Sequence, residues 1–277
     1  MTDSYTIITG GLGGLGSAFA LECGLRHRHL ILIDQHLQGS EIVDYIRDHF
    51  QVIVHYFTCD LADHEARGKF LKKLTDERWQ INGLINVVGQ EMEGKFLNRT
   101  REELQEMLQL NIGAMVDLSL AALMNRSENQ RFLLINVASL AGYFPMPYKL
   151  VYAASKRFII NFSLGLRQEI REFGNVTVLC PGGLPTNAEA MKKIFMQGFW
   201  GKITAHDTSD VVRNTMNKAE KNIPVYIPGI PSKFLVWITR ILPDHWVAAY
   251  LSGRWGKKQE HLDLWRISNG NKSQQRN

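Results

Sequence analysis

Short apolar, β-branched runs alternate along the chain with longer segments of helical periodicity. The runs cover residues 5–9, 29–34, 51–57, 81–88, 132–139 and 176–180. This alternation predicts successive βαβ units. The runs are apolar throughout and lack strict polar alternation, as expected of a parallel sheet covered on both faces. The sequence therefore predicts an α/β fold, a doubly wound parallel β-sheet with helices on both faces, in a single domain over residues 1–228.

One long amphipathic helix is predicted from Thr100 to Met124, opening with the capping-box pair Thr100 and Glu103. Asn111 and Gly113 lie in its middle, and both are poor helix formers. Because both residues disfavour a helix, a requirement other than helix propensity must account for them in the middle of this helix.

Residues 229–277 form a predicted C-terminal amphipathic tail. Pro228, Pro231 and Pro243 punctuate two short helices rich in Leu, Trp and basic residues, and the last dozen residues are expected to be disordered. Arg240 and Asp244 inside the apolar part argue against a membrane span. The tail could contact a membrane surface peripherally or cover an apolar pocket. Packing against the chain's own core or a sister subunit is favoured.

Composition narrows the function classes. The 277 residues are 45% hydrophobic and 21% charged, which suits one substantial core. The net charge is +5, but the 32 basic residues are scattered among 27 acidic ones, without the basic stripe of a nucleic-acid-binding protein. Three widely spaced cysteines suggest neither a disulfide framework nor a metal site. No signal segment is recognised at the start, so a cytoplasmic location is expected.

The first apolar run leads directly into a glycine-rich loop, Gly10, Gly11, Gly13, Gly14 and Gly16, and a helix is predicted from about Ser17. Glycines let the backbone approach a pyrophosphate, which N–H groups and the positive end of a helix can bind. A strand before the loop and a helix after it form the context that a dinucleotide site requires, so the fold is predicted to be a Rossmann fold.

Asp34 closes the second run, 18 residues after Gly16. A carboxylate there can accept both hydroxyls of the adenosine ribose. It would also repel a 2′-phosphate, and neither the loop nor residues 35–38 supply a Lys or Arg. The predicted cofactor is NAD(H) in preference to NADP(H).

Tyr152 and Lys156 are four residues apart in a predicted helix and therefore share one face. A nearby ammonium lowers the pKa of a phenol, typically by about 1 to 3 units, toward the range of a proton donor or acceptor. Ser139 closes the strand that precedes this helix, at the edge where such sheets bind ligands. Its hydroxyl can donate to a substrate carbonyl that also faces Tyr152.

Together these residues resemble the short-chain dehydrogenase/reductase family, from Tyr5 to about Thr186. The resemblance is carried by Thr9-Gly10 with Gly14 and Gly16, Asp60-Leu61, Asn86 to Gly89, Asn111, Ser139, Tyr152 with Lys156, and Pro181-Gly182 with Thr186. The chain departs from the family at Asn86-Val87-Val88-Gly89, where Asn-Asn-Ala-Gly is usual. The backbone geometry is expected to survive this change.

The resemblance implies a catalytic tetrad of Asn111, Ser139, Tyr152 and Lys156, in which Asn111 holds a water through a helix kink and Lys156 also binds the nicotinamide ribose. It implies that Asp60 faces the adenine and that Pro181 to Thr186 grip the carboxamide and begin a substrate lid over about 184–206. The full predicted cofactor site comprises Gly10, Leu12, Gly14, Leu15, Gly16, Asp34, Asp60, Leu61, Asn86, Val87, Val88, Gly89, Tyr152, Lys156, Pro181, Gly182, Leu184 and Thr186.

The predicted activity is NAD(H)-dependent interconversion of an alcohol and a ketone or aldehyde. A lipophilic substrate is suggested by Tyr143, Phe144, Met146, Phe195, Phe199 and Trp200. Two alternatives are a non-catalytic NAD(H) sensor or scaffold and a sugar-nucleotide epimerase or dehydratase. The second is disfavoured because only about 90 residues follow Pro181. The epimerase and dehydratase branch has a larger nucleotide-sugar domain there, for which these residues are too few. A homodimer or homotetramer is expected by resemblance.

Overall fold

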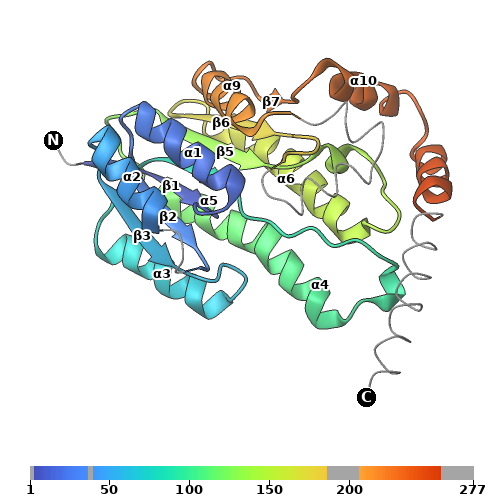
Figure 1. Cartoon of the computed structure of the whole chain (residues 1–277), viewed down its shortest axis with the longest axis horizontal. Helices are drawn as coiled ribbons and strands as arrows, with labels where there is room; N and C mark the ends of the chain where they lie inside the picture. The colour runs from blue at the N-terminus through green and yellow to red at the C-terminus, as the bar shows by residue number, and fades with distance from the viewer. Residues whose placement is uncertain (1–2, 37–39, 186–205, 257–277) are drawn as a thin grey trace.

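A computed structural model describes residues 3–36, 40–185 and 206–256. Seven strands form one parallel sheet in the order β3-β2-β1-β4-β5-β6-β7 (Figure 1). They are β1 (Ser4–Thr9), β2 (His29–Asp34), β3 (Val54–Thr58), β4 (Gln80–Asn86), β5 (Phe132–Val137), β6 (Gly174–Leu179) and β7 (Val225–Tyr226). The doubly wound parallel sheet is confirmed.

Helices cover both faces of the sheet. The α-helices are α1 (Gly14–Leu25), α2 (Ser40–Phe50), α3 (His64–Asp76), α4 (Arg101–Leu108), α5 (Ala114–Met124), α6 (Leu150–Glu169), α9 (Thr208–Glu220) and α10 (Ile230–Thr239). Three short turns join them, η1 (Phe96–Asn98), η2 (Gln109–Gly113) and η3 (Leu140–Tyr143). Consecutive strand residues point to opposite faces, so Ile7 packs in the cluster with α3 and α5 while Ile8 packs in the cluster with α1, α2 and α9.

The strand order reverses beside β1. The chain first builds outward from β1 to β2 and β3, then crosses back to place β4 on the other side of β1. In sheets of this kind, ligands bind at the carboxyl ends of the strands next to that reversal. Thr9, Asp34 and Asn86 are the last residues of three strands that meet there.

The long predicted helix forms as α4, η2 and α5, opened by the predicted capping box. Thr100 N donates to Glu103 Oε2 at 3.0 Å, and Glu103 N donates to Thr100 Oγ1 at 3.2 Å. Among the described residues, this 24-residue run alone is long and apolar enough to cross a membrane by length and composition. Ala114, Leu118 and Ala122 in its second half are fully buried in the core, while 39% of its most apolar window is buried.

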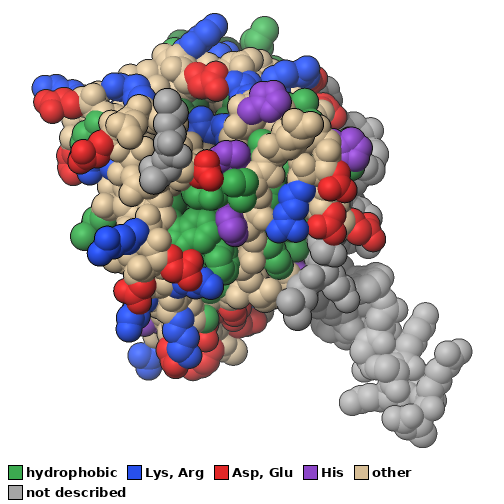
Figure 2. All heavy atoms as spheres, turned by 90° about the vertical axis from the view of Figure 1, so that its left-hand side faces the viewer, with side chains coloured by type: hydrophobic (Ala, Val, Ile, Leu, Met, Phe, Trp, Pro, Cys, Tyr) green, Lys and Arg blue, Asp and Glu red, His purple; other side chains and the backbone are tan. Residues whose placement is uncertain are grey.

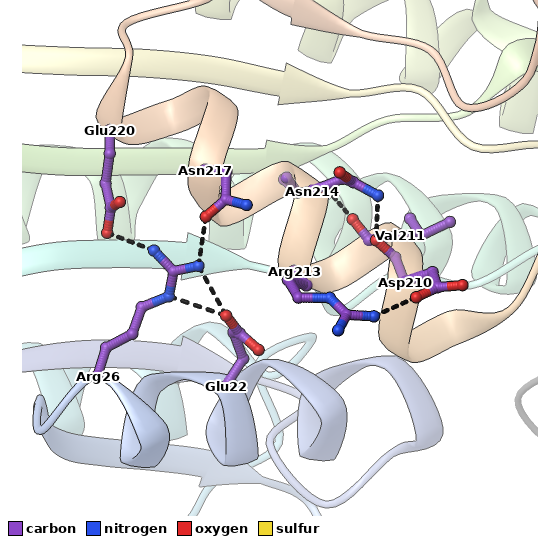
Figure 3. A network of polar contacts seen from close by, with 9 residues as sticks. Glu22, Arg26, Asp210, Val211, Arg213, Asn214, Asn217 and Glu220 are labelled. Atoms are coloured by element: carbon purple, nitrogen blue, oxygen red, sulfur yellow. Dashed lines mark hydrogen bonds and ion pairs between the residues drawn. The ribbon is translucent and has the colours of Figure 1, made fainter.

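An ion-pair network fastens α9 to α1 (Figure 3). Arg26, at the end of α1, donates to Glu22 Oε1 at 2.7 Å, to Glu220 Oε1 at 2.7 Å and to Asn217 Oδ1 at 2.7 Å. The helix that follows the glycine-rich loop is thereby held to the C-terminal part of the fold. On the face drawn in Figure 2, Lys and Arg side chains are interspersed with Asp and Glu around a hydrophobic centre.

Candidate active site

The loop after β1 needs glycine for two separate reasons. Gly10 has a left-handed φ of +63°, and Gly13 N donates to Gly10 O at 3.1 Å to close the turn. At Gly16, a Cβ atom would lie 1.9 Å from Gly10 O, so no other residue fits at that position. The loop thus folds as tightly as the predicted dinucleotide site requires.

The N-terminus of α1 is built to receive an anion. Its N-cap residue, Gly13, makes no side-chain capping bond, and the first turn contains no acidic residue. By contrast, α3, α4 and α9 are capped by Asp63, Thr100 and Asp207. An uncapped helix start leaves backbone N–H groups and the positive end of the dipole for a ligand, which fits a pyrophosphate.

Asp34 joins the end of β2 to the glycine-rich loop. It is buried, its Oδ2 accepts from Leu12 N at 3.1 Å and its Oδ1 accepts from His36 N at 3.2 Å. Each carboxylate oxygen keeps further acceptor capacity, so these bonds fix the carboxylate without exhausting it. Asp60 lies after β3, where its side chain accepts from Ala62 N at 2.9 Å.

The departure at Val87 and Val88 leaves the backbone in place. Both amides donate to Thr9 Oγ1, at 2.9 and 3.1 Å. Asn86 is buried, and its amide donates to Asn136 Oδ1 at 2.8 Å on the neighbouring strand β5. The backbone of this turn is therefore tied to β1 through Thr9, without a second Asn.

The structure brings Ser139, Tyr152 and Lys156 together. Tyr152 and Lys156 lie one turn apart on α6, with Lys156 Nζ 5.8 Å from the centre of the Tyr152 ring. Lys156 is buried and its Nζ donates to Val137 O at 3.1 Å, at the end of β5. Ser139 follows that strand; its Oγ accepts from Ala141 N at 3.1 Å, and its side chain is near enough to Tyr152 to act on the pKa of the phenol.

Asn111 lies in the π turn η2, between α4 and α5, where the sequence predicts an interruption. Its Oδ1 accepts from Gln90 N at 2.8 Å, and its Nδ2 donates to Gln90 O at 3.0 Å and to Ser155 Oγ at 3.1 Å. Ser155 lies between Tyr152 and Lys156 on α6. Asn111 therefore connects the loop after β4 to the helix that carries Tyr152 and Lys156.

The pKa of Tyr152 is shifted opposite to the sequence expectation. Burial, followed by the charge of Glu91, raises it to about 12, although Ser139 acts to lower it. Burial also lowers the pKa of Lys156 to about 8. The sequence led us to expect that Lys156 lowers the pKa of the Tyr152 phenol toward 7. This expectation is wrong for these side chains by themselves, because burial disfavours the phenolate and raises that pKa. At neutral pH Tyr152 holds its proton.

Sequence reasoning missed a charged cluster beside these residues. Lys149, the N-cap residue of α6, is buried and forms ion pairs with Glu91 and, at 3.3 Å, with Glu93. The ring of Trp255 covers its Nζ at 4.9 Å. No motif marks this cluster, because its members come from three segments that meet only in the fold.

A shallow, open pocket lies between the loop after β4 and the residues leading into Tyr152, and its lining does not include Ser139, Tyr152 or Lys156. It is mostly apolar, lined by Met92, Gly94, Phe96, Arg99, Leu104, Met107, Tyr148, Leu150 and Val151. The predicted pocket residues Tyr143, Phe144 and Met146 do not line it, and Phe195, Phe199 and Trp200 lie outside the described residues.

The segment after β6 is described only in part. Pro181 O accepts from Leu140 N at 2.9 Å, and Gly183 O accepts from His206 N at 3.3 Å. Pro181, Gly182 and Leu184 thus lie at the carboxyl edge of the sheet, beside the turn that follows Ser139. Thr186 and most of the predicted lid lie outside the described residues.

A family model described as short chain dehydrogenase matches residues 4–195. The chain belongs to the short-chain dehydrogenase family. Members of this family are oxidoreductases that use NAD(H) or NADP(H). The match covers the glycine-rich loop, the Ser139, Tyr152 and Lys156 cluster and Asn111.

Curated relatives of this short-chain dehydrogenase are oxidoreductases by name. A very-long-chain 3-oxoacyl-CoA reductase of Coprinopsis cinerea is 25% identical over 179 residues, 62% of this chain and 51% of the relative. A 3-oxoacyl-[acyl-carrier-protein] reductase of Homo sapiens is 28% identical over 211 residues, 72% of this chain and 86% of the relative. The chain spans about half the length of the very-long-chain reductases that it matches.

Solved structures share the fold. The structure in a study of 7β-hydroxysteroid dehydrogenase stereoselectivity superimposes with a TM-score of 0.81 at 18% identity, covering 90% of this chain and 96% of that one. At this identity the likeness establishes the architecture and leaves the substrate to be argued from the site.

Proposed function

We propose that this chain is an NAD(H)-dependent oxidoreductase that interconverts a secondary alcohol and a ketone. The observation that carries the proposal is the convergence of the Ser139 hydroxyl and the Tyr152 phenol, next to Lys156, at the edge of the sheet that also holds the glycine-rich loop. A bound nicotinamide would donate or accept the hydride at the substrate carbon.

The described residues orient the substrate oxygen, transfer the proton and stabilise the phenolate. Ser139 orients the substrate oxygen through a hydrogen bond, and Tyr152 donates its proton to that oxygen during reduction or accepts one during oxidation. The Lys156 ammonium stabilises the phenolate that forms when Tyr152 gives up its proton. Asn111 holds the loop at Gln90 and the α6 residue Ser155 in register with these groups.

The protonation of Tyr152 supports reduction at neutral pH. With its pKa raised to about 12, the phenol carries a proton and is ready to act as an acid. Oxidation requires the phenolate, which these surroundings disfavour. We therefore propose carbonyl reduction as the faster direction near pH 7.

The preference for NAD(H) is proposed from Asp34. Its carboxylate is fixed beside Leu12 by two backbone bonds, at the position where an adenosine ribose meets the second strand. A 2′-phosphate placed there would meet a buried negative charge, and burial makes that repulsion stronger than it is in water.

The proposed substrate is an apolar ketone. The pocket before Tyr152 is lined mainly by aliphatic, aromatic and methionine side chains, which suit a hydrocarbon chain or ring. The names of the two curated relatives refer to 3-oxoacyl groups, which join a carbonyl to such a chain.

A homo-oligomer is proposed from the outer faces of α5 and α6. Leu120 and Met124 on α5, and Phe158 and Leu164 on α6, are exposed apolar side chains. Pairing of these faces between copies would bury them.

A substrate screen that follows NADH absorbance tests the proposed function. Aliphatic, bulky and ring ketones are each offered with NADH and with NADPH, and faster turnover with NADH is expected. Asp34→Ser should reduce the preference for NADH by about tenfold or more, since removing the repulsion is worth at least about 1.4 kcal/mol. NADH binding without turnover of any carbonyl would favour the sensor alternative, and unchanged cofactor preference in Asp34→Ser would contradict the role of Asp34.

A further inference from the structure

The C-terminal helix α10 buries one face and exposes an apolar one. Ser232 and Val236 are buried on the side that packs near η3. Ile230, Phe234, Trp237 and Ile241 follow one another at spacings of four, three and four residues, so they share the opposite face. All four are exposed, from 57% for Phe234 and Trp237 to 81% for Ile230.

The same arrangement continues beyond α10. Residues 244–256 are also helical, with Val247 buried and with Trp246 and Tyr250, four residues apart, exposed. The two helices together present an exposed surface that we name the tail stripe, formed by Ile230, Phe234, Trp237, Ile241, Leu242, Trp246 and Tyr250. Exposed large apolar side chains gathered on neighbouring helices are typical of an interaction site on a folded protein.

The composition of the tail stripe suits the boundary between water and lipid. Trp and Tyr are the residues that concentrate at membrane interfaces, because their rings are apolar and carry a polar atom. Lys233 and Arg240 lie exposed between the apolar residues, where they can reach lipid phosphates while the rings enter the acyl boundary.

The net charge of the sequence falls in its C-terminal part, of which the described residues 230–256 carry +2. Residues 230–277 contain eight Lys and Arg and three Asp and Glu, a formal charge of +5, which equals that of the whole chain. Residues 1–229 contain 24 of each sign and are formally neutral. A neutral body with a positive, aromatic C-terminal part is complementary to an anionic surface.

We propose that α10 and the helical segment 244–256 dock this protein on an anionic lipid bilayer, with the tail stripe in the headgroup region. A second copy of the chain fits the stripe less well. A two-fold contact would place one positively charged tail against another, and like charges would oppose it. The proposal is independent of the catalytic assignment, because its readout is binding to lipid.

Co-sedimentation of the full chain with vesicles tests the proposal. One set contains phosphatidylcholine alone, and the other an equal mixture of phosphatidylcholine and phosphatidylglycerol. Binding to the mixed vesicles, weakened by salt, and little binding to the neutral ones are expected. Phe234→Ser with Trp237→Ser, and separately Lys233→Glu with Arg240→Glu, should each weaken binding by about tenfold or more.

Matched controls separate this docking from general stickiness. Leu25→Ser changes an apolar side chain of similar exposure, 61%, at the end of α1, and Lys69→Glu with Lys72→Glu reverses two exposed charges on α3. Both should bind like the parent, and circular dichroism should show every variant folded. Equal binding by parent and stripe variants, or no binding by the parent, overturns the proposal. Light scattering gives a third outcome. If the parent is a dimer that does not bind vesicles, and the stripe variants are monomers, the tail stripe is a subunit interface and the proposal fails.

Discussion

Gly89 lies directly against Lys156. A Cβ atom at Gly89 would be 3.0 Å from Lys156 Nζ and 3.3 Å from Asn111 Oδ1. The missing side chain thus makes room for two residues of the proposed tetrad. Val87 and Val88 contribute only their backbone amides to Thr9, which explains why this turn keeps its glycine while it departs from the family at the two preceding positions.

Gly89→Ala should lower turnover by about tenfold to a hundredfold. The added methyl group pushes the ammonium and the amide away from their places, and displacements of this size in an active site cost about that much. Steady-state kinetics with the best ketone measure the loss. Val87→Ala is the control, because it keeps the backbone amide; an equal loss in both variants would show a general disturbance of the turn.

Glu91→Gln should move the pH dependence of alcohol oxidation to lower pH. The charge of Glu91 raises the pKa of Tyr152 and that of Lys156, so removing it lowers both. The phenolate that accepts the proton then forms at lower pH. Rates measured across the alkaline range, with melting temperatures recorded at each pH, give the position of the rising limb.

The control for Glu91→Gln is Glu65→Gln. Glu65 pairs with Lys69 on the exposed surface of α3, and its neutralisation changes the net charge by the same amount. Its pH profile should match that of the parent. A profile of Glu91→Gln that stays in place, or moves to higher pH, would refute the assigned influence of Glu91 on Tyr152.

Arg67→Met should lower the free energy of unfolding by about 1 to 3 kcal/mol, because it leaves buried hydrogen-bond acceptors without their donor. Arg67 is 1% exposed and donates to Asp117 Oδ2 at 2.8 Å, to Gln109 Oε1 at 3.2 Å and to Leu61 O. These bonds join the loop after β3 to the π turn that carries Asn111. Urea unfolding followed by circular dichroism measures the change.

Arg213→Met provides the contrast to Arg67→Met. Arg213 pairs with Asp210 on the exposed side of α9, where an ion pair contributes at most about 1 kcal/mol. If both variants lost the same free energy of unfolding, the hydrogen bonds of the buried Arg67 would stabilise the fold no more than an exposed ion pair does.

Most of the fold could be predicted because its signals are local. Runs of Ile, Leu and Val marked six strands, and Thr100 with Glu103 marked the start of α4. The predicted start of the third strand at residue 51 was wrong, since Gln51 has a φ of +54° and β3 begins at Val54. Strand β7, only two residues long, was missed because so short a run has no periodicity.

The active site could be predicted only as far as single residues reveal chemistry. Tyr152 and Lys156 were predicted from their spacing, Ser139 from its place at the end of a strand, and Asn111 from the family resemblance. The structure places them at one edge of the sheet. The direction of the Tyr152 pKa shift could not be foreseen, because burial arises from tertiary packing. The pairing of Lys149 with Glu91 was missed for the same reason, since its partners are 58 residues apart.

The central claim is that Tyr152 moves the proton, and the most direct test compares Tyr152→Phe with the parent. NADH binding, followed by fluorescence titration, should be nearly unchanged, while turnover of the best ketone should fall by about a hundredfold to ten-thousandfold. Turnover by Tyr152→Phe equal to that of the parent, with NADH bound equally well, would contradict the account.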